Sequence, residues 1–100
     1  MKLWVDDVRL APDLSYFPVP SVDLAKIYIK YCEDCGTPLE FIDIDHDAGD
    51  YSKHGGDYIK LLDWLEETGR NYPIRIHSMN PVGVENMRRI IQRNGWKEIR

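Results

Sequence analysis

Long apolar runs are missing from this chain, and its N-terminus lacks the basic segment followed by an apolar one that marks a signal peptide. A transmembrane helix needs about 20 consecutive apolar residues. We therefore expect no membrane partner and, by default, a cytoplasmic protein. The composition, with 43% hydrophobic and 30% charged residues, is typical of a folded chain, and 100 residues suffice for one core. Residues 1–100 are thus predicted to form a single domain.

Cysteine is scarce: Cys32 and Cys35 are the only two, and two acidic residues separate them. Structural zinc needs four ligands, and no second Cys/His pair of suitable spacing is present. A reactive thiolate is favoured by cations or by a helix N-terminus, whereas this pair lies near the expected C-terminus of a helix. We expect reduced cysteines with a structural role.

Basic residues are outnumbered, since 13 Lys and Arg stand against 17 Asp and Glu for a net charge of −4. Tight binding to duplex DNA needs a basic surface, so duplex DNA is not an expected partner. The charge is also uneven: residues 75–100 hold six basic and two acidic residues, and residues 1–74 carry a net −8. This division can mark an anion-binding face beside an acidic cation site, although ordinary charged helix surfaces would produce it too.

Short apolar segments of strand character alternate with stretches of helical periodicity. The alternation predicts right-handed βαβ units, and therefore a parallel sheet with helices on both faces. Pro18 and Pro20 confine their strand to an edge or an irregular position, and Arg75 suggests that its strand lies at or near an edge of the sheet. Strands are predicted at residues 2–5, 16–19, 40–45 and 73–76, and residues 96–99 predict either a short last strand or a tail.

Three helices are predicted from their caps and apolar spacing. The first begins after Ser21 and ends at Gly36, the second closes at residues 66–69, and the third begins with Asn80 as N-cap before Pro81. The expected buried residues are Leu24, Ala25, Tyr28 and Cys32 in the first helix, Tyr58, Leu61, Leu62 and Leu65 in the second, and Val84, Met87 and Ile91 in the third.

Carboxylates follow two of the predicted strands at the point where each strand ends. Asp6 and Asp7 follow the first strand, and Asp45 and Asp47 lie at the end of the strand at residues 40–45. Ligands bind at the carboxyl ends of parallel strands, and carboxylates that meet there repel one another unless a cation lies among them. We predict a Mg²⁺ site on Asp6, Asp7 and Asp45. Asp47 is either a fourth ligand, directly or through water, or a clamp that orients a histidine.

Histidines follow two of the same strands. His46 and His77 are interpreted as general base and general acid on a phosphodiester, although either one alone would equally suit a structural hydrogen bond. Ser78 and Asn80 offer donors for a phosphoryl oxygen, with Asn80 equally suited to capping a helix. Arg9 is a candidate for holding the phosphate, or for a surface salt bridge.

At these positions the chain resembles a response-regulator receiver domain, specifically the divergent group of cyclic-phosphate processing receiver domains. The resemblance lies in three segments: Leu3-Trp-Val-Asp-Asp-Val-Arg9, Ile44-Asp-His-Asp-Ala-Gly49 and His77-Ser-Met-Asn-Pro-Val-Gly83. It implies that Asp6 and Asp7 bind metal, that Asp45 stands at the phospho-accepting position and that Ser78 stands at the receiver's hydroxyl position.

The fold that this resemblance implies is a three-layer α/β, flavodoxin-like sheet of order 2-1-3-4. It is truncated, because there is barely room for a first helix between Asp7 and Tyr16, and the chain ends before a full fifth βα unit with the receiver's phosphate-contacting lysine.

Three functional hypotheses follow. The leading one is a metal-dependent phosphoesterase for cyclic phosphodiesters, such as 2′,3′-cyclic phosphates of nucleotides or RNA ends, with Asp45 or water as nucleophile. The second is a signalling or binding module that is phosphorylated at Asp45 or recognises partners through that pocket, without turnover. The third is a phage or bacterial accessory domain that kept the acidic pocket without using it.

Overall fold

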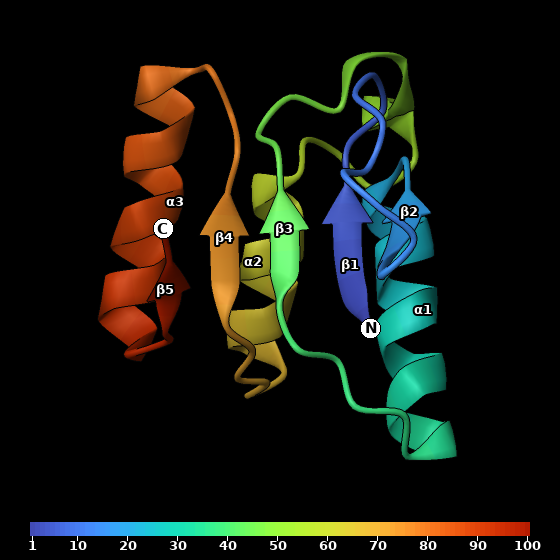
Figure 1. Ribbon diagram of the computed structural model, residues 1–100. Helices are drawn as coiled ribbons and strands as arrows, with labels where there is room; N and C mark the ends of the chain where they lie inside the picture. Colours follow the sequence, from blue (N-terminus) through green and yellow to red (C-terminus); the bar gives the residue numbers. More distant parts are fainter.

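The computed structural model describes all 100 residues and contains one parallel sheet with the strand order β2-β1-β3-β4-β5 (Figure 1). The order 2-1-3-4 is therefore confirmed, and the last segment of the chain is a rudimentary strand beside β4. The strand that carries Arg75 is the last but one in the sheet, near an edge as expected. The strands are β1 (Lys2–Val5), β2 (Tyr16–Val19), β3 (Ile42–Ile44), β4 (Ile74–Ile76) and β5 (Glu98–Ile99).

The helices begin and end where the capping residues predict. The Ser21 side chain accepts a hydrogen bond from the backbone N–H of Leu24, and Gly36 ends that helix in the left-handed region with φ 68°. Asn80 caps the last helix, and Pro81 is its first residue. The helical elements are α1 (Val22–Cys35), the 3₁₀ helix η1 (Gly49–Lys53), α2 (Ile59–Glu67) and α3 (Pro81–Asn94). None of them combines the length and apolarity that crossing a membrane requires.

The hydrophobic core lies between one face of the sheet and all three α-helices. Alternate strand residues such as Leu3, Val5 and Ile44 point into it and are fully buried. The buried residues of α1 differ from the expected stripe, because Ile29 is fully buried and Leu24 is 46% exposed. Helical spacing alone allowed either stripe; the direction in which α1 packs on the sheet selects the one through Ile29.

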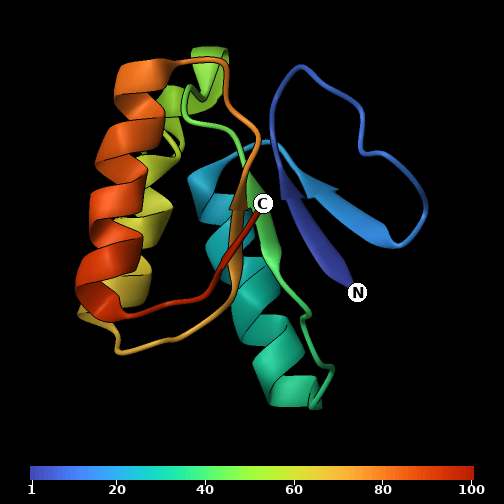
Figure 2. The same ribbon diagram turned by 60° about the vertical axis from the view of Figure 1, so that its left-hand side comes forward.

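The other face of the sheet carries no helix, which corrects the expectation of helices on both faces. In Figure 2 the three helices lie on one side of the sheet, and residues 6–15 form a loop on the opposite side. Handedness explains the separation: the connection from β1 to β2 moves across the sheet in the opposite direction to the other connections, so a right-handed path takes it over the other face. The loop at residues 6–15 therefore takes the place of the second helical layer that was expected on this face.

The packing of α1 can be tested by comparing two apolar residues of that helix. Ile29→Ala should lower the free energy of unfolding by about 2–5 kcal/mol, because it leaves a cavity in the core. Leu24→Ala, the matched control, should change it by about 0.5 kcal/mol or less. Urea unfolding followed by circular dichroism measures both values, and equal losses would contradict the packing described above.

Candidate metal and phosphate site

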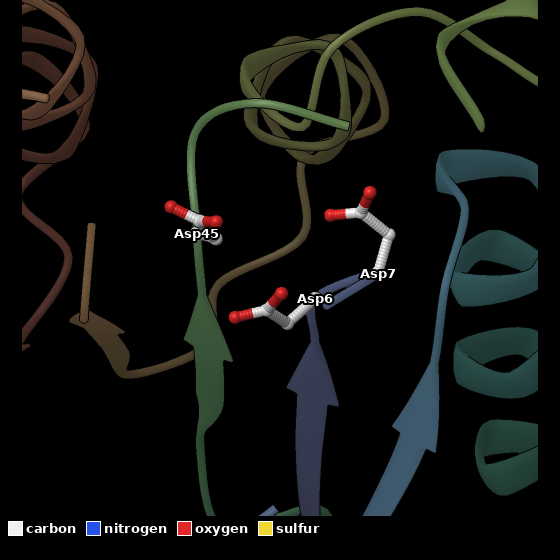
Figure 3. Close-up of side chains that lie close together, drawn as sticks. All are labelled: Asp6, Asp7 and Asp45. Carbon is white, nitrogen blue, oxygen red and sulfur yellow. The ribbon is translucent and has the colours of Figure 1, made fainter. Parts of the chain in front are cut away.

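Three carboxylates converge at the carboxyl edge of the sheet. Asp6 and Asp7 follow β1, Asp45 follows β3, and each offers an oxygen atom within 4.8 Å of the others (Figure 3). The sheet ladder continues one residue beyond each strand, since Asp6 N–H donates to the Val19 carbonyl and Asp45 N–H to the Val5 carbonyl. The strand pairing therefore sets the spacing of Asp6 and Asp45. Carboxylate oxygens at this spacing suit a divalent cation such as Mg²⁺.

Asp6 is buried and held as a carboxylate by several donors. Its Oδ1 accepts hydrogen bonds from the backbone N–H groups of Val8 (2.9 Å) and Arg9 (3.1 Å), and its Oδ2 contacts His77 Nε2 at 2.8 Å. Burial would raise the pKa of Asp6, but these hydrogen bonds outweigh burial and lower the pKa below its ordinary value. Asp6 is thus fixed both in position and in its charged state.

Asp7 has the opposite electrostatic environment. Burial and the negative charges of nearby carboxylates, Asp6 first among them, raise the pKa of Asp7 above its ordinary value. Gly49 lies against this side chain: its φ is +55°, and a Cβ there would come within 2.6 Å of Asp7 Oδ2. The close approach of the β3–α2 connection therefore requires glycine, and the repulsion at Asp7 is what a bound cation would relieve.

Arg9 lies beside two of the three carboxylates. Its Nη1 is 3.2 Å from Asp45 Oδ2 and 3.4 Å from Asp6 Oδ2. The Arg9 side chain is 46% exposed, so this cation can reach solvent as well as the cluster. Of the two alternatives for Arg9, the structure shows a salt bridge within the site, which leaves a phosphate contact as a proposal.

His77 is wedged between two buried carboxylates on the helix-free face. Its Nε2 contacts Asp6 at 2.8 Å, its Nδ1 contacts Asp43 Oδ1 at 2.6 Å, and its ring stacks on Trp4 with centroids 4.0 Å apart and planes 1° apart. Both contacts with carboxylates are hydrogen bonds from histidine when both ring nitrogens carry a proton. The side chain is only 9% exposed. The structure thus brings His77 to the aspartate cluster as a buried partner of Asp6.

Asp43 is a site residue that sequence analysis did not include. Its fully buried carboxylate contacts three side chains: Tyr16 Oη at 3.3 Å, Arg75 Nη1 at 3.0 Å and His77 Nδ1 at 2.6 Å. Arg75 lies directly opposite Asp43 in the pairing of β3 with β4. The available signal was an aspartate and an arginine each in the middle of an apolar strand, with Asp43 on the same side of its strand as Asp45.

His46 has a different environment from His77. Its Nδ1 contacts Asp47 Oδ1 at 2.8 Å, and its Nε2 makes no hydrogen bond within the chain. The ring lies against the first turn of α3, where a Cβ on Gly83 would overlap it. Asp47 is largely exposed and does not belong to the three-carboxylate cluster. Of the two roles considered for Asp47, the clamp on a histidine fits these contacts.

Ser78 and Asn80 shape the start of α3. Ser78 Oγ accepts a hydrogen bond from the Asn80 backbone N–H at 3.1 Å, and Asn80 Oδ1 accepts one from Gly83 N–H at 3.0 Å. Asn80 is therefore the N-cap of α3, which was one of its two expected roles. The Asn80 amide NH₂ and the proton of the Ser78 hydroxyl are not used by these contacts.

The strand order, the acidic pair after β1 and the third aspartate after β3 define a receiver-like domain of the flavodoxin-like class. Residues 1–93 match the family described as the cyclic-phosphate processing receiver domain, and the chain belongs to this family. Comparisons with curated proteins and with solved structures give no match.

The repulsion at Asp7 predicts opposite effects of one substitution with and without metal. Asp7→Asn should raise the melting temperature of the metal-free protein, because an ionised group whose pKa is raised by folding destabilises the fold at pH 7. Mg²⁺ at 100 times its Kd should stabilise the wild type by about 2.7 kcal/mol, and Asp7→Asn should lose most of that gain. Since protons compete for Asp7, Mg²⁺ affinity should also fall as the pH is lowered.

Thermal unfolding with and without MgCl₂ measures these effects. Asp34→Asn is the matched control, because it removes one exposed carboxylate from the C-terminal part of α1. Equal Mg²⁺ stabilisation of wild type and Asp7→Asn would rule out Asp7 as a ligand.

The contribution of the buried Asp43 carboxylate to stability can be tested by substitution. Asp43→Asn should lower the free energy of unfolding by about 3–5 kcal/mol, because Arg75 and His77 lose a buried anionic partner. Glu33→Gln, which weakens a more exposed pair with Arg70, should cost about 1 kcal/mol or less. Urea unfolding measures both changes, and a small loss for Asp43→Asn would show that the network adds little to stability.

Proposed function

We propose that this receiver-like domain is a metal-dependent phosphoesterase that opens cyclic phosphodiesters, such as the 2′,3′-cyclic phosphates of nucleotides or RNA ends. The observation that carries this proposal is the convergence of Asp6, Asp7 and Asp45 at the strand ends, where the backbone N–H of His46 donates to Asp45 Oδ1 at 2.8 Å. Membership of a cyclic-phosphate processing family supports the substrate class. The proposed partner is therefore a phosphorylated small molecule or an RNA end.

The three carboxylates would hold Mg²⁺ or a similar divalent cation. Such an ion supplies positive charge to the phosphoryl oxygens when bound. Arg9, which already contacts two of the carboxylates, would pair with a phosphate oxygen that enters the cluster. The Ser78 hydroxyl and the Asn80 amide, at the N-terminus of α3, would donate further hydrogen bonds to the phosphate.

His46 is the proposed proton carrier. In the reaction a water oxygen bonds to phosphorus while one ester P–O bond of the ring breaks, so water loses one proton and the leaving oxygen gains one. An imidazole can perform both transfers in turn. The contact with Asp47 orients the His46 ring, and its Nε2 has no competing partner within the chain.

His77 is assigned a positioning role instead of an equal share in proton transfer. Both of its nitrogens contact buried carboxylates, so moving a proton to or from it would break a contact that holds Asp6. This assignment refines the pairing of His46 and His77 expected from the sequence. Asp45 is kept as an alternative nucleophile to water.

The second candidate function is a module without turnover. It is favoured by the position of Asp45, which follows β3 where a receiver accepts a phosphoryl group, and by the full engagement of His77. In this case small acyl phosphates would phosphorylate Asp45, or a partner would bind at the pocket.

The test is a ring-opening assay over 2′,3′-cyclic nucleotides and short RNAs with cyclic ends, with and without Mg²⁺. His46→Ala should lower kcat by about 10²- to 10⁴-fold, the usual contribution of a general acid–base group, while Mg²⁺ binding persists. His54→Ala, which removes an exposed histidine at the end of η1, is the matched control and should keep full activity.

One result would contradict the phosphoesterase, and two others would change the role of a single residue. Failure of the wild type to open any cyclic phosphate, together with labelling of Asp45 by acetyl phosphate, would favour the signalling module. Ring opening that persists in His46→Ala would remove His46 from the reaction. Trapping of Asp45 by beryllofluoride during turnover would identify Asp45 as the nucleophile in place of water.

A further inference from the structure

Two cavities share one wall beside the aspartate cluster. The first has a volume of about 350 Å³ and is lined by Asp6, Asp7 and Arg9 with neighbouring loop residues. The second, here named the aromatic groove, has a volume of about 420 Å³ and is lined by Phe17, Leu24, Ile27, Tyr28 and Tyr31. Residues 18–20 line both. The two cavities are therefore adjacent, on either side of the end of β2.

The wall is firmly anchored. The Val19 carbonyl accepts a hydrogen bond from the Asp6 backbone N–H at 3.2 Å, and the Pro20 carbonyl accepts one from the buried Tyr58 hydroxyl at 2.7 Å. Two prolines further restrict its backbone. The relative position of the two cavities is thus built into the end of β2.

Several large apolar side chains are exposed next to one another in the aromatic groove. Phe17 is 40% exposed and Tyr31 is 60% exposed, and the Phe17 ring stacks on Tyr28 with centroids 4.0 Å apart. None of the residues that line the groove is charged. A contiguous apolar surface of this kind is typical of a binding site.

An added β-strand does not suit this groove, although β2 is the edge strand. The carbonyls of Ser15 and Val19 point toward β1, so the backbone groups of Tyr16, Pro18 and Pro20 point outward. Tyr16 N–H is already directed to the Asp13 carbonyl, and proline has no N–H. The outer edge therefore offers a partner strand no free backbone donor.

A chain of nucleotides also fits poorly. Residues 1–74 carry a net charge of −8, and Arg9 is the only basic residue that lines either cavity. Every additional phosphate would be repelled by this surface. The occupant that matches is one charged group at the aspartates joined to an uncharged, flat group in the groove.

We infer that the aromatic groove binds the nucleobase of a mononucleotide whose cyclic phosphate lies at the aspartate cluster. The inference rests on the proposed function and narrows it from RNA ends to free cyclic nucleotides. Every nucleobase has a flat face that can stack on an exposed aromatic ring. Phe17 and Tyr31 supply such rings in the groove.

The test compares two substrates that contain the same five-membered cyclic phosphate. Adenosine 2′,3′-cyclic phosphate carries a base, and glycerol 1,2-cyclic phosphate does not. Phe17→Ala should lower kcat/KM for the nucleotide by about 5- to 150-fold, the range that loss of one stacking contact gives, and leave the glycerol substrate unchanged. Phe17→Leu, which keeps apolar bulk without an aromatic face, should fall between. Leu14→Ala, at a 99% exposed apolar residue outside the groove, is the matched control.

Different results would overturn the groove inference and the phosphoesterase proposal. If the wild type opens both substrates equally well and Phe17→Ala changes neither, the groove inference is overturned and the phosphoesterase stands. If neither ring is opened, the phosphoesterase fails, and calorimetric titration with adenosine 2′,3′-cyclic phosphate decides the groove: weaker binding to Phe17→Ala supports it, and no binding to the wild type overturns it.

Two further outcomes would overturn the inference. One is tighter binding of a short RNA with a cyclic end than of the mononucleotide. The other is a wild-type dimer in sedimentation that Phe17→Ala or Tyr31→Ala dissociates without changing nucleotide affinity, which would make the groove a contact between two copies of the chain.

Discussion

The balance of charge on the helix-free face is the constraint on which the rest of the structure depends. Asp6, Asp43 and Asp45 are all buried on neighbouring strands, where like charges repel strongly. His77 lies between Asp6 and Asp43, Arg75 pairs with Asp43, and Arg9 spans Asp6 and Asp45. These contacts join three strands through side chains as well as through the sheet ladder. The buried carboxylates can therefore lie close together, which is the geometric condition for a cation site at the strand ends.

The charged network lies on this face of the sheet because no helix connects β1 to β2. Because the connection from β1 to β2 is only a loop, no helix packs on the second face of the sheet (Figure 2). Trp4 shows the change: its ring stacks on His77, and its Nε1 donates to the Arg9 carbonyl at 2.9 Å. One aromatic side chain thus links the loop, the histidine and the sheet. The same loop forms one side of the cavity beside the aspartates.

Sequence analysis predicted the features that depend on local pattern. Strand ends, the caps at Ser21 and Asn80 and the meeting of Asp6 with Asp45 follow from periodicity and from the geometry of parallel sheets. The features that it missed depend on side-chain direction across strands. Asp43 acquires its role only because the register sets it opposite Arg75, and its contact with His77 crosses from β3 to the end of β4. Likewise, the choice of Ile29 over Leu24 depends on how α1 packs on the sheet.

The two histidines show why similar sequence positions need not mean similar roles. Each follows a strand and each contacts an aspartate, yet His77 is enclosed by two carboxylates and Trp4, whereas His46 has one exposed carboxylate and a free nitrogen. A group that transfers protons must be able to change its charge, and a change at His77 would unbalance Asp6 and Asp43 together. A change at His46 disturbs only an exposed contact with Asp47. The network that keeps the carboxylates together therefore engages both ring nitrogens of His77, whereas Nε2 of His46 has no partner within the chain.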